Sequence, residues 1–139
     1  MMNEWLAAYQ ATTYRVFLGE DVCDLRIAQV AEKMCHWLET TGAVTFAIVT
    51  ADNPASRRLS PAENCLRHAV LQEDLRVLAL PFFVAENRPD EASWPVETAC
   101  CVMGLPLDAA LELGRRHGQN AIVFGGTDGL PQLYWIEKE

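Results

Sequence analysis

The chain has 139 residues, 50% apolar and 22% charged, a composition typical of one globular domain over residues 1–139 and unlike disordered or fibrous proteins. Nineteen acidic residues against eleven basic ones give a net charge of −8, and such a surface repels the phosphates of nucleic acids and anionic lipids. The longest uncharged apolar stretches, residues 77–85 and 99–107, have nine residues each, whereas a membrane span needs about 20. We therefore expect neither a nucleic-acid partner nor membrane association.

Cysteine usage and the N-terminal sequence favour a cytoplasmic protein. The five cysteines include the adjacent pair Cys100-Cys101, and a disulfide between neighbours on a strand would be strained. The sequence has no C-x-x-C motif, so we expect free thiols, no metal site and no cofactor. The first ten residues contain Glu4 and no basic segment before a long apolar core, which argues against a signal peptide.

The first half of the chain predicts two helices and two strands. Residues 4–11 form a helix, and residues 13–18, rich in β-branched and aromatic side chains, form a strand that ends in a turn at residues 19–21. A stripe of apolar side chains at helical spacing then predicts a second helix that ends at Gly42. The stripe consists of Ile27, Val30, Ala31, Met34 and Leu38. Residues 44–50 are uncharged and β-branched, which indicates a central strand covered on both faces.

The second half opens with a strong signal for the start of a helix. In Ser60-Pro61-Ala62-Glu63, the serine caps the helix, the proline takes the first helical position and the glutamate completes a capping box. This helix runs to about Leu75. Apolar strands, turns and one further helix follow. We expect strands at residues 77–85, 97–104, 120–124 and 133–136, a polar loop at 86–94, a helix from Pro106 to His117 and a hairpin turn at 127–129.

This order of elements predicts an α+β domain, or a mixed-sheet α/β domain. Strands and helices do not strictly alternate, and at least one hairpin is implied. We expect a central, mostly mixed β-sheet with about four helices packed on it.

One segment carries a specific motif. Residues 50–64 read T-A-x-N-P-x-S-x-x-L-S-x-x-E-N, and further matching pieces lie elsewhere in the chain. These pieces are Ala8-Tyr9, Thr13-Tyr14, Trp94-Pro95, Gly104 and residues 118–122. With this pattern the chain resembles, over nearly its whole length, the bacterial domain-of-unknown-function family numbered 3293. That family has no assigned activity, so the resemblance implies domain boundaries and motif positions but no reaction. Val96 stands where the resemblance leads us to expect an acidic residue, so a carboxylate pair with Glu97 would keep one member at most.

The loop from Thr50 to Ser60 is the best candidate for a ligand site. It leaves the carboxyl end of a central strand and enters a helix N-terminus, a place that suits ligands of open sheets and anions. Glu97 and Gln119, which flank two other predicted strands, are expected to join the same pocket. The predicted ligand-binding residues are Thr50, Asn53, Ser56, Arg57, Ser60, Asn64, Glu97 and Gln119. The alternative is structural, with a turn at Asn53, a helix cap at Ser60 and Asn64 tying the loop down.

Two functions follow from this loop. The first is a non-catalytic module that binds a small anionic ligand or a protein partner, and the alternative is a small enzyme acting on a nucleotide-like or phosphorylated substrate. No catalytic residue can be named, because none of the three histidines lies in a recognisable serine or cysteine motif. An enzyme requires Asn53, Ser56, Glu97 and Gln119 to converge around a concave pocket, whereas a binding module requires instead an exposed apolar patch or a plain anion cradle. The sequence gives no oligomeric state.

Overall fold

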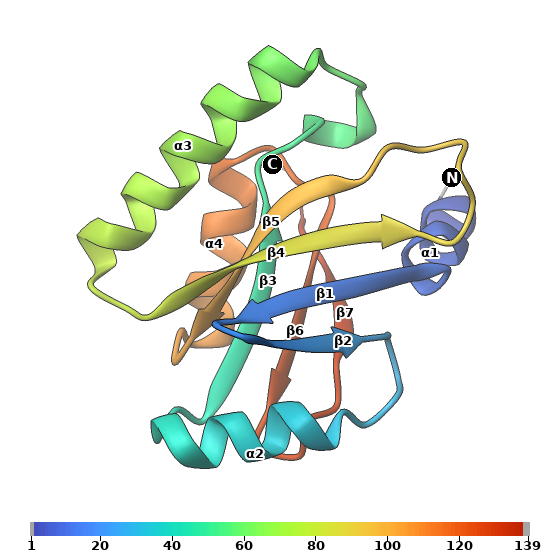
Figure 1. The fold of residues 1–139 in the computed structure, drawn as a ribbon. Coiled ribbons are helices and arrows are strands. Elements are labelled where there is room, and N and C mark those ends of the chain that lie inside the picture. Colours follow the sequence, from blue (N-terminus) through green and yellow to red (C-terminus); the bar gives the residue numbers. More distant parts are fainter. Residues whose placement is uncertain (1, 138–139) are drawn as a thin grey trace.

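The computed structural model describes residues 2–137, and its strands form one seven-stranded sheet in the order β2-β1-β4-β5-β3-β6-β7 (Figure 1). The elements in chain order are α1 (Met2–Gln10), β1 (Thr12–Leu18), β2 (Asp21–Leu25), α2 (Glu32–Thr41), β3 (Thr45–Thr50), a 3-10 turn (Pro54–Ser56), α3 (Pro61–Leu78), β4 (Phe82–Pro89), β5 (Glu97–Met103), α4 (Leu107–Arg116), β6 (Ala121–Gly126) and β7 (Gln132–Trp135). The predicted α+β class, with four helices packed on a central sheet, is confirmed.

The sheet is antiparallel between all neighbouring strands, so the expected mixed pairing was wrong. The reason lies in the helical crossovers, as α3 and α4 show. Helix α3 connects β3 to β4, but β5 lies between these strands in the sheet, and α4 connects β5 to β6 with β3 between them. Each crossover therefore skips one strand, and the strand in the gap runs in the opposite direction.

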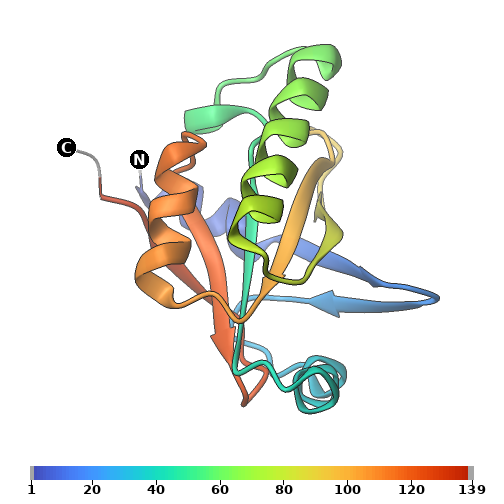
Figure 2. The same cartoon turned by 90° about the vertical axis from the view of Figure 1, so that its left-hand side faces the viewer.

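Strand β3 is buried on both faces, as its uncharged sequence predicted. Phe46 and Ile48 face one core, which α1 and α2 cover, while Ala47 and Val49 face a second core under α3 and α4. Figure 2 shows α3 and α4 next to each other, with α2 at the far end of the molecule. The adjacent cysteines of β5 divide in the same way between the two cores.

Two differences from the predicted elements lie before β3. Strand β2 was not predicted, because only Cys23 and Leu25 of its five residues are buried and its two aspartates disfavour a strand. Helix α2 begins at Glu32 and not near Ile27. Ala28 there has a left-handed φ of 67°, and its N–H donates to the Pro131 carbonyl instead of a helical partner.

Two more differences surround β4. Helix α3 continues to Leu78 and ends at Ala79 in the left-handed conformation, so the apolar run that predicted a strand from Val77 is partly the exposed last turn of a helix. Strand β4 then runs on to Pro89, through residues expected in a polar loop. Polar side chains are compatible with a strand here because this part of β4 lies beside the site described below.

Candidate functional site

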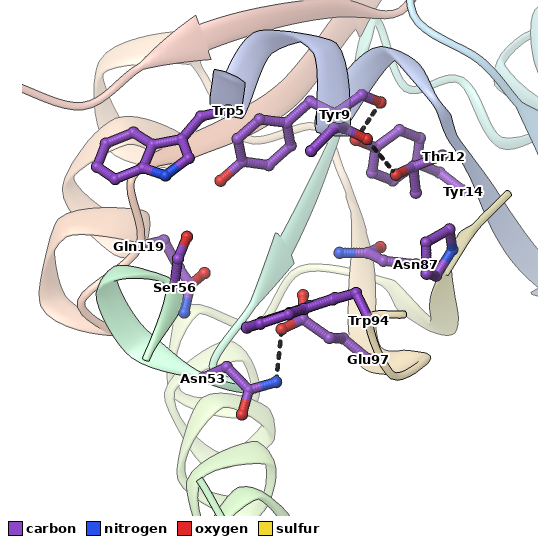
Figure 3. A pocket seen from close by; sticks show the side chains of 12 residues that line it. Trp5, Tyr9, Thr12, Tyr14, Asn53, Ser56, Asn87, Trp94, Glu97 and Gln119 are labelled. Atoms are coloured by element: carbon purple, nitrogen blue, oxygen red, sulfur yellow. Dashed lines mark hydrogen bonds between the residues drawn. The ribbon is translucent and has the colours of Figure 1, made fainter. Parts of the chain in front are cut away.

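A cavity of about 350 Å³ opens between α1, the 3-10 turn and the β4–β5 connection, a volume within the usual range of small-molecule sites (Figure 3). Its lining combines aromatic rings with uncharged polar side chains and one carboxyl group. The lining residues are Trp5, Ala8, Tyr9, Thr12, Tyr14, Asn53, Ser56, Asn87, Pro89, Trp94, Glu97 and Gln119. Segments far apart in the chain meet here.

Asn53 connects the loop after β3 to neighbouring elements through hydrogen bonds. It is 3% exposed and has a left-handed φ of 46°, a conformation that asparagine tolerates better than most residues. Its Oδ1 accepts hydrogen bonds from the Leu59 N–H (2.8 Å) and from Asn64 Nδ2 (2.9 Å), and its own N–H donates to Asn64 Oδ1 (2.9 Å). Its Nδ2 donates to Glu97 Oε2 over 2.7 Å. The side chain thus joins the loop, α3 and the start of β5.

Glu97 is the acidic group of the cavity. Burial raises its pKa to about 7, and the negative charge of Asp52 adds to this, while the hydrogen bond from Asn53 and the side chain of Trp94 act in the opposite direction. Asp52 lies outside the cavity lining and is itself buried, with Oδ2 accepting from the Thr98 N–H at 2.9 Å. Near neutral pH, Glu97 can therefore either donate or accept a proton.

Aromatic rings form the opposite side of the cavity. Trp5 and Tyr9 come from α1 and Tyr14 from β1, and Figure 3 shows them across the space from Trp94 and Glu97. The Tyr14 hydroxyl donates to the Tyr9 carbonyl (3.0 Å), and burial raises the pKa of the Tyr9 phenol to about 12, so both phenols stay protonated. These rings offer flat apolar surface that suits a planar ligand.

The remaining polar side chains lie at the rim of the same space. Gln119 Nε2 donates to the carbonyls of Asp52 (3.1 Å) and His117 (3.2 Å), which holds its amide in place. Ser56 Oγ accepts from Asn120 Nδ2 at 2.9 Å. The Oδ1 atom of Asn87 is buried and has no hydrogen-bond partner among the described residues.

The eight predicted ligand-binding residues fall into two groups. The four named for convergence, Asn53, Ser56, Glu97 and Gln119, all line the cavity. The others lie elsewhere. Thr50 donates to the Thr98 carbonyl (2.7 Å), Asn64 binds the Asn53 backbone and side chain, Ser60 forms the predicted capping box with Glu63, and Arg57 lines a separate hollow with Arg115 and Gly118. The loop therefore combines cavity-lining residues with the structural roles considered as the alternative.

The aromatic side of the cavity was missed. Nothing in the spacing of the matching pieces Ala8-Tyr9, Thr13-Tyr14 and Trp94-Pro95 indicates that they meet the Asn53 loop. Strand β1 pairs with β4, which brings Tyr14 opposite Asn87, and this pairing places α1 against the site. Only the order of strands in the sheet reveals that relationship.

A family model described as a protein of unknown function, DUF3293, matches residues 49–122, more than half of the chain. The chain belongs to this family. The matched region of this DUF3293 protein contains the Asn53 loop, Trp94, Glu97 and Gln119, but it begins after α1 and β1. No curated protein and no solved structure matches the chain.

No helix within residues 2–137 is long and apolar enough to cross a membrane. The same part of the chain has no group of three or more histidine, cysteine, aspartate or glutamate side chains placed to hold a metal ion.

Proposed function

We propose that this protein is a cytoplasmic bacterial module that binds a small, flat, nitrogen-containing molecule in the cavity between α1 and the Asn53 loop. The observation that carries the proposal is the convergence of Asn53, Ser56, Glu97 and Gln119 from separate segments around one concave, aromatic-walled space. Small-molecule sites typically combine apolar and aromatic walls with a few placed polar groups. The five cysteines support the cytoplasmic location.

The charge of the lining favours a neutral or cationic ligand over the anion expected from the loop alone. Among the described lining residues, Glu97 is the one acid, and none is a lysine or an arginine. The helix N-terminus of α3 is occupied by its own cap, with Ser60 Oγ accepting from the Glu63 N–H and the Glu63 carboxylate accepting from the Ser60 N–H, both at 3.2 Å. An anion or a protein partner at Arg57 would use a different surface.

Binding is tested by a thermal-shift screen of flat heterocycles, followed by titration of tryptophan fluorescence, because Trp5 and Trp94 both line the cavity. We expect at least one heterocycle to raise the melting temperature of the wild type and to lose its effect in Trp94→Ala. Arg57→Ala is the control because Arg57 lies in the Asn53 loop next to the cavity-lining Ser56 but does not itself line the cavity, and this variant should bind normally. If no compound binds, or if Trp94→Ala binds as well as the wild type, the proposal is wrong.

A second candidate function is catalysis at the same place, on a nucleotide-like substrate. It is favoured by the convergence of the four polar residues, which an enzyme requires, and by Glu97, because a buried carboxyl group with a pKa of about 7 in a cavity suits general acid–base chemistry. Its test is turnover of the heterocycles that bind, as nucleosides and nucleotides, by the wild type and Glu97→Gln. Loss of turnover in the variant with binding retained would support it, and absence of turnover in the wild type would leave a binding module.

A further inference from the structure

The carboxyl group of Glu97 lines the cavity and accepts a hydrogen bond from Asn53 at 2.7 Å. Resting on the binding function proposed above, we infer that the ligand presents an amidine edge, a ring nitrogen beside an exocyclic amino group, to the Glu97 carboxyl group. Nucleobases carry such an edge. A carboxyl group and an amidine edge form two parallel hydrogen bonds, as a carboxylate does with an arginine side chain.

The carboxyl group is held in position before any ligand arrives. Asn53 Nδ2 fixes Glu97 Oε2 at 2.7 Å, and the other polar atoms of Asn53 are engaged by Leu59 and Asn64, so Asn53 cannot turn away. Each carboxylate oxygen accepts two hydrogen bonds, so the contact with Asn53 leaves Glu97 capacity for a ligand. A preorganised acceptor of this kind favours a ligand whose donors are equally rigid.

The surroundings of Glu97 favour a flat ring at that edge. Trp94 lies beside the carboxyl group, and Trp5 and Tyr9 lie across the cavity (Figure 3). Aromatic faces bind heterocycles by stacking, and this stacking does not depend on which base is bound. The edge contact to Glu97 would therefore decide which heterocycle is preferred.

The protonation of Glu97 also supports an amidine edge on the ligand. The groups that face Glu97 are Asp52 after β3, Tyr9 on α1 and Tyr14 on β1, with the Arg58 guanidinium 5.6 Å from the Trp94 ring centre. Because burial and Asp52 raise the pKa of Glu97 to about 7, one proton can be shared with a weakly basic heterocycle. Glu97 and the heterocycle then pair either as a neutral carboxyl group with a neutral base or as a carboxylate with a protonated base. Two hydrogen bonds form in both cases.

This inference predicts a bell-shaped pH dependence of affinity. At low pH both Glu97 and the heterocycle are protonated, so one proton must leave before they can pair. At high pH both are deprotonated, and the proton that the two hydrogen bonds need is missing. A ring of the same shape without the amino group lacks one hydrogen bond and should bind more weakly. 2-Aminobenzimidazole and benzimidazole are a matched pair of probes for this difference.

The experiment measures the affinity of both probes by fluorescence titration between pH 5 and 9 for the wild type, Glu97→Gln and Trp94→Ala. We expect the wild type to prefer 2-aminobenzimidazole at least tenfold near pH 7. Glu97→Leu, measured in the same way, should lose this preference while still binding both rings. Glu97→Gln keeps a donor beside an acceptor, so it should retain the preference but not the fall in affinity at high pH, and Trp94→Ala should bind neither ring.

The outcomes separate the inference from the function on which it rests. Equal affinity of the wild type for both probes, or a preference that persists in Glu97→Leu, would overturn the amidine edge and leave the cavity as a binding site. Binding of both probes unchanged in Trp94→Ala would overturn the site itself. Melting curves of the free variants show whether each is folded, and the pH profile of the wild type tests the inference without any substitution.

Discussion

Asn53 donates a hydrogen bond from Nδ2 to Glu97 Oε2 over 2.7 Å, and this bond links the loop after β3 to the first residue of β5, 44 positions later in the chain. The same asparagine is bound on its other side by Asn64 of α3. One side chain therefore couples the stability of the loop to the orientation of the acidic group in the cavity. Replacing Asn53 should change both.

Asn53→Ala should destabilise the protein by about 2–4 kcal/mol, because it leaves the Leu59 N–H and the Asn64 amide without the Asn53 acceptor and replaces asparagine at a left-handed φ. Urea unfolding at pH 7 measures the loss. Asn53→Asp is the matched variant. It keeps the acceptor for Leu59 and Asn64 but removes the donor to Glu97 and adds a negative charge beside it, so the pKa of Glu97 should rise further. An unchanged urea midpoint in Asn53→Ala would contradict the role assigned to this residue.

Ser60→Ala should cost about 1 kcal/mol, the usual contribution of a helix N-cap, without affecting binding in the cavity. Ser60 Oγ accepts from the Glu63 N–H, and Ser60 is not among the lining residues. Urea unfolding and ligand titration of the same preparation separate the two effects. Ser60→Asp, which also caps helices well, should retain most of the stability. A loss of affinity with no loss of stability would show that the residue belongs to the ligand site after all.

Local patterns in the sequence were enough to predict most of the helices and strands. Ser60 and Glu63 define the start of α3, and Gly42 ends α2 at a left-handed φ of 77°, because capping and chain reversal depend on neighbouring residues. Strand β2 escaped prediction because an exposed edge strand needs few apolar residues. The antiparallel pairing also escaped, because a helical connection in the sequence does not say whether it skips a strand.

The candidate site was predicted on one side only. Asn53, Ser56, Glu97 and Gln119 could be grouped because polar residues at strand ends tend to meet at one edge of a sheet. Trp5 and Tyr14 could not be added to them. Their place depends on β1 pairing with β4, which is a long-range contact with no local signal.

His117 should make the protein less stable in mild acid. Its Nε2 lies 2.9 Å from Asp74 Oδ2, between the end of α4 and α3, and its side chain is 6% exposed. Burial lowers its pKa below the ordinary value of 6.5, although Asp74 partly offsets this. The unfolded chain therefore takes up a proton before the folded protein does, so stability is present above pH 6.5 and is lost as the pH falls.

Urea midpoints of the wild type and His117→Gln between pH 5 and 7.5 test this prediction. Glutamine can still donate to Asp74 but does not titrate, so the difference between the two proteins should change with pH in that range. His36→Gln is a control at another histidine of the chain. A difference between wild type and His117→Gln that is constant with pH would contradict the prediction.

Glu97 should have the opposite effect on stability, because its pKa is raised. The folded protein holds the Glu97 proton up to about pH 7, whereas the unfolded chain releases it near 4.5. The favourable contribution is thus fully present below pH 4.5 and is lost as the pH rises through 7. Glu97→Gln keeps an acceptor for Asn53 and removes the buried charge, so relative to the wild type it should gain about 3 kcal/mol between pH 4.5 and 8. Urea unfolding at several pH values measures this difference.

Glu63→Gln is the control of opposite sign, because the Ser60 cap lowers the pKa of Glu63 and its contribution is lost only on acidification below 4.5. If the difference between Glu97→Gln and the wild type did not change with pH, the Glu97 carboxyl group would titrate normally, and its place as the proton-carrying group of the cavity would have to be abandoned.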